Sequence, residues 1–239
     1  RHYGGRRAWP RRYRQGRDPG HHRQERRSRR HGLYVRDAVA KSGGRLTGFS
    51  TVNPFEGGRT LRALRRSIED DGFRGLKLHG NIQEFYPWRR RLYPIYAAMQ
   101  EYGFPILFHS GGIGVRPYRD KYGDPVAFDD IACDFPELPI ILGHAGRTWY
   151  DSTAMLLRKH PHVHAEVSTN FGRDEKSRLV PMARLFEAVR GWAGTTNNLL
   201  FGSDHPLYPQ RATVEGLRAL EEACRVGTAA ILEPEDVRR

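Results

Sequence analysis

Residues 104–112 read FPILFHSGG, an apolar run that delivers His109 into a loop of small residues. The run is bounded by Pro and Gly and has the length of a buried strand. The same pattern, a short apolar run with a polar side chain at its end, occurs six times. The six runs lie at residues 45–54, 72–80, 104–112, 138–146, 162–170 and 198–206. We therefore predict six strands.

The stretches between these runs have the apolar spacing of amphipathic helices. Several of them end in Gly or Pro, as helices commonly do. They lie at residues 60–72, 91–103, 128–137, 153–161 and 179–192. Strands that alternate with helices predict βαβ units and hence a parallel sheet.

Both a doubly wound sheet and a (β/α)₈ barrel fit this alternation. Polar residues at the ends of successive strands favour the barrel, whose chemistry lies at that end. No G-x-G-x-x-G motif lies between a strand and a helix, which weakens the case for a dinucleotide-binding sheet. We predict an α/β fold of the TIM-barrel type that is incomplete, because only six βα units can be counted.

Charge divides the 239-residue chain into two parts. Residues 1–31 hold twelve Arg and only two acidic residues, Asp18 and Glu25. This segment therefore carries most of the chain's net charge of +13, and the rest of the chain is close to neutral. We predict a basic, disordered leader at 1–31 and a barrel domain at 32–239. A nucleic-acid-binding role for this leader is a less favoured alternative.

The sequence also bears on where the protein works. No apolar run is long enough for a membrane span, and no apolar stretch follows the basic leader as in a secretory signal. Cys133 and Cys224 cannot build a disulfide framework. We predict a cytoplasmic protein that does not enter membranes.

Three side chains at strand ends form the predicted centre of the site: His109, His144 and Asp204. Equivalent ends of neighbouring strands lie close together, so two histidines there can share a metal or a substrate. Imidazole and carboxylate ligands suit Zn²⁺ and are acceptable to Mn²⁺ or Fe²⁺. The alternative for Asp204 is a helix cap or an ion pair with arginine.

Further candidates for substrate binding surround this centre. Lys77 and His79 are two residues apart, on one face of a strand. If that face is the barrel interior, Lys77 could bind an acidic substrate or form a carboxylated lysine between two metals; otherwise it reaches solvent. Phe85 and Tyr86, with Trp88, are predicted to wall the substrate or to pack on the scaffold.

Arg147, directly beyond the loop that holds His144, could hold a carboxylate with two hydrogen bonds. Glu166 and Asn170, on the fifth run, are lesser candidates. A structural or surface role is the alternative for each of these three residues.

Five motifs occur in a recognisable order: STVNP, GFRGLKLHGNIQEFYP, RLYPIYAAMQEYGFPILFHSG, PIILGHAG and LLFGSDHP. Together, over about residues 33–210, they resemble the amidohydrolase-related family of metal-dependent (β/α)₈ barrels. The branch of the family that they resemble includes aminocarboxymuconate-semialdehyde decarboxylase. The resemblance implies that the six runs are strands three to eight of the barrel.

The resemblance also implies roles for three residues. His109 corresponds to the metal ligand of the fifth strand, and Asp204 to the metal-binding carboxylate of the eighth, which also orients the nucleophile. His144 corresponds to the histidine of the sixth strand, a general base or a ligand. A divalent metal lowers the pKa of bound water to about 7, which supplies hydroxide at neutral pH.

One family motif is missing. The first strand of such barrels carries a His-x-His pair, but here His21 and His22 are adjacent and lie among arginines. We expect that the first two strands are missing or replaced and that residues 1–31 result from a frameshift or a wrong start. The remaining ligands are one short of a catalytic metal site.

The predicted function is metal-dependent hydrolysis of a small, carboxylated substrate, with Zn²⁺ as the expected metal. The alternatives are a non-hydrolytic decarboxylase and a catalytically dead barrel that acts as a scaffold. Barrels of this kind often pair, so a homodimer is an alternative to a monomer.

Overall fold

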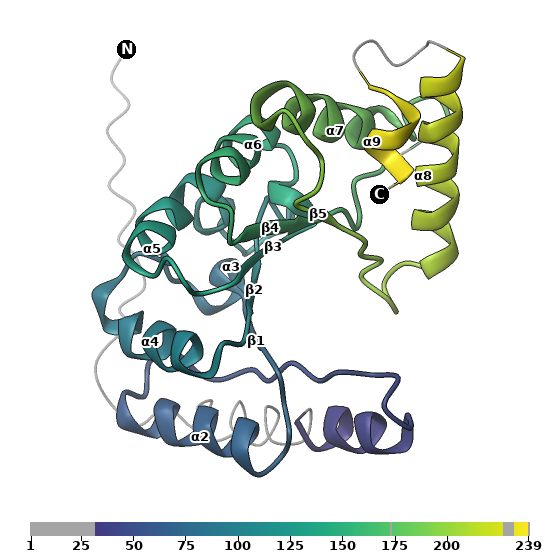
Figure 1. The fold of residues 1–239 in the computed structure, drawn as a ribbon. Helices are drawn as coiled ribbons and strands as arrows, with labels where there is room; N and C mark the ends of the chain where they lie inside the picture. The colour runs from purple at the N-terminus through teal and green to yellow at the C-terminus, as the bar shows by residue number, and fades with distance from the viewer. Residues whose placement is uncertain (1–31, 173, 227–231, 239) are drawn as a thin grey trace, which may run out of the picture.

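The computed structural model describes residues 32–172, 174–226 and 232–238, and these form one parallel sheet flanked by helices (Figure 1). Each strand pairs in parallel with the next one along the chain. The strands are β1 (Leu76–Leu78), β2 (Ile106–His109), β3 (Ile140–Gly143), β4 (Val163–Glu166) and β5 (Leu199–Leu200). The predicted parallel α/β fold is therefore confirmed.

Helices follow the strands as the βαβ pattern predicts. They are α2 (Gly58–Glu69), α3 (Gly80–Gln83), α4 (Tyr93–Tyr102), α5 (Asp129–Asp134), α6 (Tyr150–Lys159), α7 (Val180–Ala193), α8 (Gln210–Arg225) and α9 (Pro234–Arg238). Residues 32–41 are also helical. The five predicted helical stretches correspond to α2, α4, α5, α6 and α7. Gly103, in a left-handed conformation, ends α4, so the helix stop expected there is confirmed. Gly194, also left-handed, ends α7 two residues beyond the predicted stretch.

The two faces of the sheet differ in burial. Residues such as Leu76, Phe108 and Leu142 are fully buried or nearly so, whereas the alternate residues Lys77 and Ile141 are only half-buried. Figure 1 shows α4, α5, α6 and α7 along one side of the curved sheet. The alternation shows that one face packs on the helices and the other, which corresponds to a barrel interior, stays partly open.

The first predicted strand, at residues 45–54, is reduced to one bridge. Ser50 pairs in parallel with Leu76, and its backbone accepts a hydrogen bond from the N–H of Lys77 at 2.7 Å. Within the described residues the sheet does not close into a barrel. A run paired on one side only has few hydrogen bonds to fix it as a strand.

The core lies between the sheet and its helices. Phe108 packs against Tyr96 and Phe128, with ring centroids 6.0 and 5.0 Å apart. Phe85, which we predicted as a wall of the substrate site, is 0% exposed and belongs to this core, where Phe55 meets it edge-on at 6.2 Å. Its burial favours the alternative that this ring packs on the scaffold.

Two further predictions concern the basic leader and the absence of membrane spans. The basic leader, with His21 and His22, lies outside the described residues. Among the described residues, no helix is long and apolar enough to cross a membrane.

Candidate active site

The polar side chains predicted from the strand ends gather at one edge of the sheet. His109 is the last residue of β2 and pairs in register with Gly143, the last residue of β3. His79 directly follows β1, and His144 directly follows β3. Because parallel strands end at the same edge, these residues lie around what would be the mouth of a barrel.

Three histidine rings form a continuous row. The ring of His79 stacks on that of His109, with centroids 3.9 Å apart and planes at 10°. His109 in turn meets His144 edge-on at 4.7 Å. The row thus links the ends of three neighbouring strands, and one substrate could touch more than one ring.

The backbone of His144 is held in an uncommon conformation by β4 and the loop after it. Its φ of 62° lies in the left-handed region, which costs a non-glycine residue free energy. Its N–H donates to Oε1 of Glu166 at 2.6 Å, and its carbonyl accepts from Nδ2 of Asn170 at 3.0 Å. Glu166 and Asn170, which we placed among the lesser candidates, therefore position His144.

The ring of His144 is oriented by a hydroxyl that the sequence did not single out. Nδ1 lies 2.8 Å from Oγ of Ser168 and 3.2 Å from Oγ1 of Thr169. The Ser168 hydroxyl donates to Oε1 of Glu166 at 2.9 Å, so its oxygen is left to accept a hydrogen bond from Nδ1–H. This arrangement favours the tautomer in which Nε2 of His144 carries a lone pair.

Burial keeps the histidine row neutral. Burial, then the charges of Arg147 and Lys77, lower the pKa of His144 to about 3. Burial and the charge of Lys77 lower the pKa of His79 to about 4. The pKa of His109 is also far below its usual value, first because of burial and then because of the neighbouring histidines. Near neutral pH these imidazoles are therefore unprotonated.

Lys77 lies on the open face beside acidic groups. Burial is the main influence on its pKa and lowers it, while the charges of Glu166 and Asp204 act in the opposite direction. A methyl group built at Gly143 would lie 3.3 Å from Nζ of Lys77 and 3.6 Å from Oε1 of Glu166. The lysine therefore points across the sheet toward the site, as the interior alternative predicts.

Arg147 contributes a cation with no acidic partner among the described residues. Nη2 contacts Oγ1 of Thr169, and Nη1 donates to the carbonyl of Gly112 at 3.4 Å. Nε is buried and has no hydrogen-bond partner within the described part of the chain. A half-buried guanidinium that meets only neutral oxygens still has capacity to bind an anion.

Tyr86, another predicted substrate contact, packs away from Phe85. Its ring stacks on Trp88 at 5.2 Å and meets Tyr122 edge-on at 4.8 Å. The pair lines one wall of a hollow of about 450 Å³. The other residues around this hollow are Lys121, Asp124, Val126, Ala127, Asp129 and Asp130.

The predicted metal ligands meet only part of the requirement for a metal site. Nε2 of His109 is buried without a hydrogen-bond partner among the described residues, as an unused ligand atom would be. However, the described residues do not group His109 and Asp204 with a third His, Cys, Asp or Glu at metal-binding spacing. Asp204 follows β5 on a loop and is half-exposed. These two residues alone do not complete a divalent metal site, as the missing His-x-His pair leads one to expect, and the pair of His109 and Asp204 stays a prediction.

Comparisons with known proteins agree on the fold. An uncharacterised TIM-barrel protein from Bordetella bronchiseptica has a TM-score of 0.66 and 19% identity, covering 78% of this chain and 64% of its own. A 2,6-dihydroxybenzoate decarboxylase from Rhizobium has a TM-score of 0.63 and 17% identity, with coverage of 88% and 73%. A dihydroxybenzoic acid decarboxylase from a Polaromonas species, with bound manganese and the inhibitor 2-nitroresorcinol, has a TM-score of 0.64 and 16% identity, with coverage of 90% and 73%.

The chain thus spans between 64% and 73% of the lengths of these three structures. The search of curated proteins gave no match. Strands of the TIM-barrel type with polar residues at their carboxyl ends define the class: part of a (β/α)₈ barrel of the kind that carries enzyme sites.

The family follows from the sequence itself. A sequence profile described as Amidohydrolase matches residues 5–239. The chain belongs to the amidohydrolase family. The match begins inside the segment predicted as a leader and extends past the region 33–210 on which we based the resemblance. Metal-dependent catalysis is the property of this family, and one of the similar structures holds manganese.

Proposed function

We propose that this edge of the sheet binds a small carboxylated compound and that His144 transfers a proton during its hydrolysis. Arg147 carries the proposal, because it is a half-buried cation without an acidic partner among the described residues. Lys77, on the same side, adds positive charge. A carboxylate would gain charge-assisted hydrogen bonds here and would offset the cost of burying the guanidinium.

In this mechanism His144 acts as the general base. The Ser168 oxygen accepts a hydrogen bond from Nδ1–H, so the proton stays on Nδ1 and Nε2 is free to take a proton from water or from the substrate. Glu166 positions both His144 and Ser168, since its carboxylate accepts hydrogen bonds from the backbone N–H of His144 and from the hydroxyl of Ser168. The lowered pKa of His144 keeps the ring unprotonated before substrate binds.

The family's metal would supply Lewis acidity and a more acidic water when bound. Zn²⁺ is the cation that imidazole and carboxylate donors favour, with Mn²⁺ or Fe²⁺ as alternatives. No step is assigned to it here, because the described residues do not complete its ligand set.

Decarboxylation is the second candidate. It is favoured by the names of two similar structures, which are decarboxylases of dihydroxybenzoic acids. Arg147 would serve both reactions, since each begins with a bound carboxylate. The difference lies in the fate of the proton: hydrolysis needs it taken from water, and decarboxylation needs it delivered to the carbon that has lost CO₂.

Product analysis separates the two reactions. The full chain, with added Zn²⁺ or Mn²⁺, is incubated with one set of hydroxybenzoates and one set of carboxylated amides and lactones. Hydrolysis of the second set supports the proposal, whereas release of CO₂ from the first set supports the second candidate. Turnover of uncharged esters or amides at the same rate as their carboxylated counterparts would contradict both, because neither would then need Arg147.

A further inference from the structure

A second group of ligand-type side chains lies away from the histidine row. Asp129 and Cys133 are four residues apart on α5, so they share one face of that helix. His160 directly follows α6 and comes three residues before β4 begins. It thus lies near the amino end of β4, whereas the histidine row lies around the carboxyl ends of the strands.

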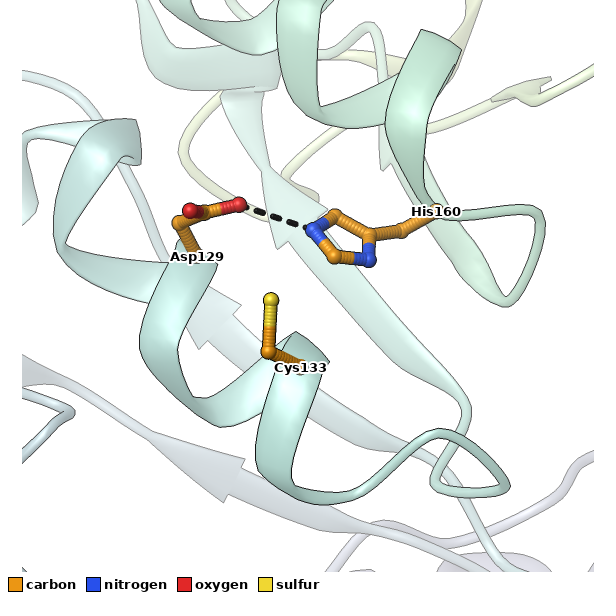
Figure 2. Close-up of side chains that lie close together, drawn as sticks. All are labelled: Asp129, Cys133 and His160. Carbon is orange, nitrogen blue, oxygen red and sulfur yellow. Dashed lines mark hydrogen bonds and ion pairs between the residues drawn. The ribbon is translucent and has the colours of Figure 1, made fainter.

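The three side chains converge on one point. One ligand atom from each residue lies within 4.8 Å of the other two, and Figure 2 shows the carboxylate and the sulfur facing the same side of the imidazole. Nε2 of His160 is 2.8 Å from Oδ1 of Asp129. His160 is 6% exposed, so its ring is fixed, while Cys133 is exposed. One of the three ligands is buried and two can be reached from solvent. We call the group of Asp129, Cys133 and His160 the cup.

A positive charge already lies at this cup. Nζ of Lys159 donates to the two carboxylate oxygens of Asp129 at 2.9 and 2.8 Å. Hydrogen bonding to Asp129 is the main cause that raises the pKa of Lys159, and Cys133 adds to it. The lysine side chain is 53% exposed, so its flexible stem can leave when a stronger cation arrives.

Two more observations concern the surroundings of the cup. Asp129 lines the open hollow of about 450 Å³ described above, so solutes can reach this one of the three ligands from there. His162, whose ring lies 5.6 Å from that of His160, has a buried Nε2 without a hydrogen-bond partner among the described residues. This nitrogen lies beside the group without belonging to it, since among the described residues only Asp129, Cys133 and His160 bring ligand atoms to one point.

We propose that Asp129, Cys133 and His160 bind a divalent cation of the zinc class and thereby tie α5 to the junction of α6 and β4. Thiolate, imidazole and carboxylate are the donors that select Zn²⁺ over Mg²⁺ or Ca²⁺. On binding, the Cys133 thiol releases its proton to solvent, Nε2 of His160 binds as the neutral imidazole, and Lys159 leaves the carboxylate. Three protein ligands leave the fourth position to water.

Titration of the full chain with Co²⁺ tests the site, because a cobalt–thiolate bond produces a charge-transfer absorption that oxygen and nitrogen ligands do not. We expect this absorption to rise to one equivalent of cobalt per chain and to be displaced by Zn²⁺. The histidine row contains no cysteine, so cobalt bound there would not contribute. The absorption therefore reports on this cup independently of the proposed function.

Matched variants complete the experiment. Cys133→Ser and Asp129→Asn should abolish the absorption, while Cys224→Ser and Asp130→Asn should retain it. Lys159→Met should tighten cobalt binding by roughly tenfold, because it removes a competing positive charge. Far-ultraviolet circular dichroism checks that each variant is folded.

The contrary outcomes are equally definite. Absence of the charge-transfer absorption in the folded parent chain would overturn the proposal, as would its survival in folded Cys133→Ser. In either case the cluster would be an ion pair with a cysteine beside it. Unchanged cobalt affinity in Lys159→Met would contradict the displacement of the lysine by the metal.

Discussion

Nδ1 of His144 lies 2.8 Å from Oγ of Ser168. That contact links the imidazole to Glu166 through a hydroxyl that donates its own proton onward. The hydrogen bond to Ser168 keeps the proton of the neutral imidazole on Nδ1, so Nε2 is the nitrogen that can accept a proton. The chemistry proposed for this chain depends on that orientation.

Replacing Ser168 by Ala should lower kcat by about 10- to 100-fold, because the ring of His144 loses the acceptor that sets its tautomer. KM should change little, since Ser168 does not bind the substrate in this mechanism. Steady-state kinetics on the substrate found by product analysis measures both. Ser177→Ala, in a loop where that hydroxyl donates to Asp174, serves as the control. An equal loss in both variants would remove Ser168 from the mechanism.

Replacing Arg147 by Gln should raise KM for a carboxylated substrate by about 10- to 100-fold, with a smaller change in kcat. The substituted amide cannot form the charge-assisted pair of hydrogen bonds that a guanidinium offers. Arg158→Gln, on an exposed face of α6, is the matched control. If KM is unchanged in Arg147→Gln, the carboxylate binds elsewhere.

The histidine row should make the metal-free protein sensitive to acid. His144 and His79 have pKa values of about 3 and 4 in the folded protein, against 6.5 for an unperturbed histidine. Between these values the unfolded chain binds more protons, so stability is full above pH 6.5 and falls as the pH is lowered toward 4. Each histidine contributes a slope of at most about 1.4 kcal/mol per pH unit.

Urea unfolding between pH 7.5 and 4.5, with EDTA present, measures this dependence. His144→Asn should flatten the loss of stability on acidification, whereas His205→Asn, at an exposed position, should not. A parent protein whose unfolding free energy does not fall over this range would contradict the neutral, buried row.

Phe85→Ala should destabilise the fold by about 3–5 kcal/mol, because it leaves a cavity in the core. Phe201→Ala, at a ring that is 57% exposed, should cost far less. Unfolding midpoints in urea compare the two. A stable Phe85→Ala protein with a raised KM would instead return Phe85 to the substrate site, as the sequence first predicted.

Local patterns predicted much of the fold. Apolar runs such as the one before His109 were long enough to identify five of the strands, and their polar ends located the histidine row. The run around Ser50 was overestimated, because a strand also needs neighbours, and only Leu76 pairs with it in the described chain. Helix α8 lies beyond the last predicted helical stretch and was not predicted.

The site itself was harder to predict, because its supporting contacts are tertiary. Ser168 and Thr169 look like ordinary loop residues in HVHAEVSTN, and only the fold brings them to His144. The one available signal in the sequence was their position close to Glu166, because all three residues lie at the end of a predicted strand, where site residues gather. Cys133 and His160 likewise belong to different helical segments that meet only in the folded chain.

The central claim, that Arg147 binds the carboxylate of a small substrate, is tested most directly by calorimetric titration. The full chain is titrated with 2,6-dihydroxybenzoate and, separately, with resorcinol, which has the same ring and hydroxyls without the carboxylate. We predict that the benzoate binds more tightly than resorcinol and that Arg147→Gln removes the difference while Arg158→Gln keeps it. Equal affinities for the two compounds, or a preference that survives in Arg147→Gln, would contradict the account.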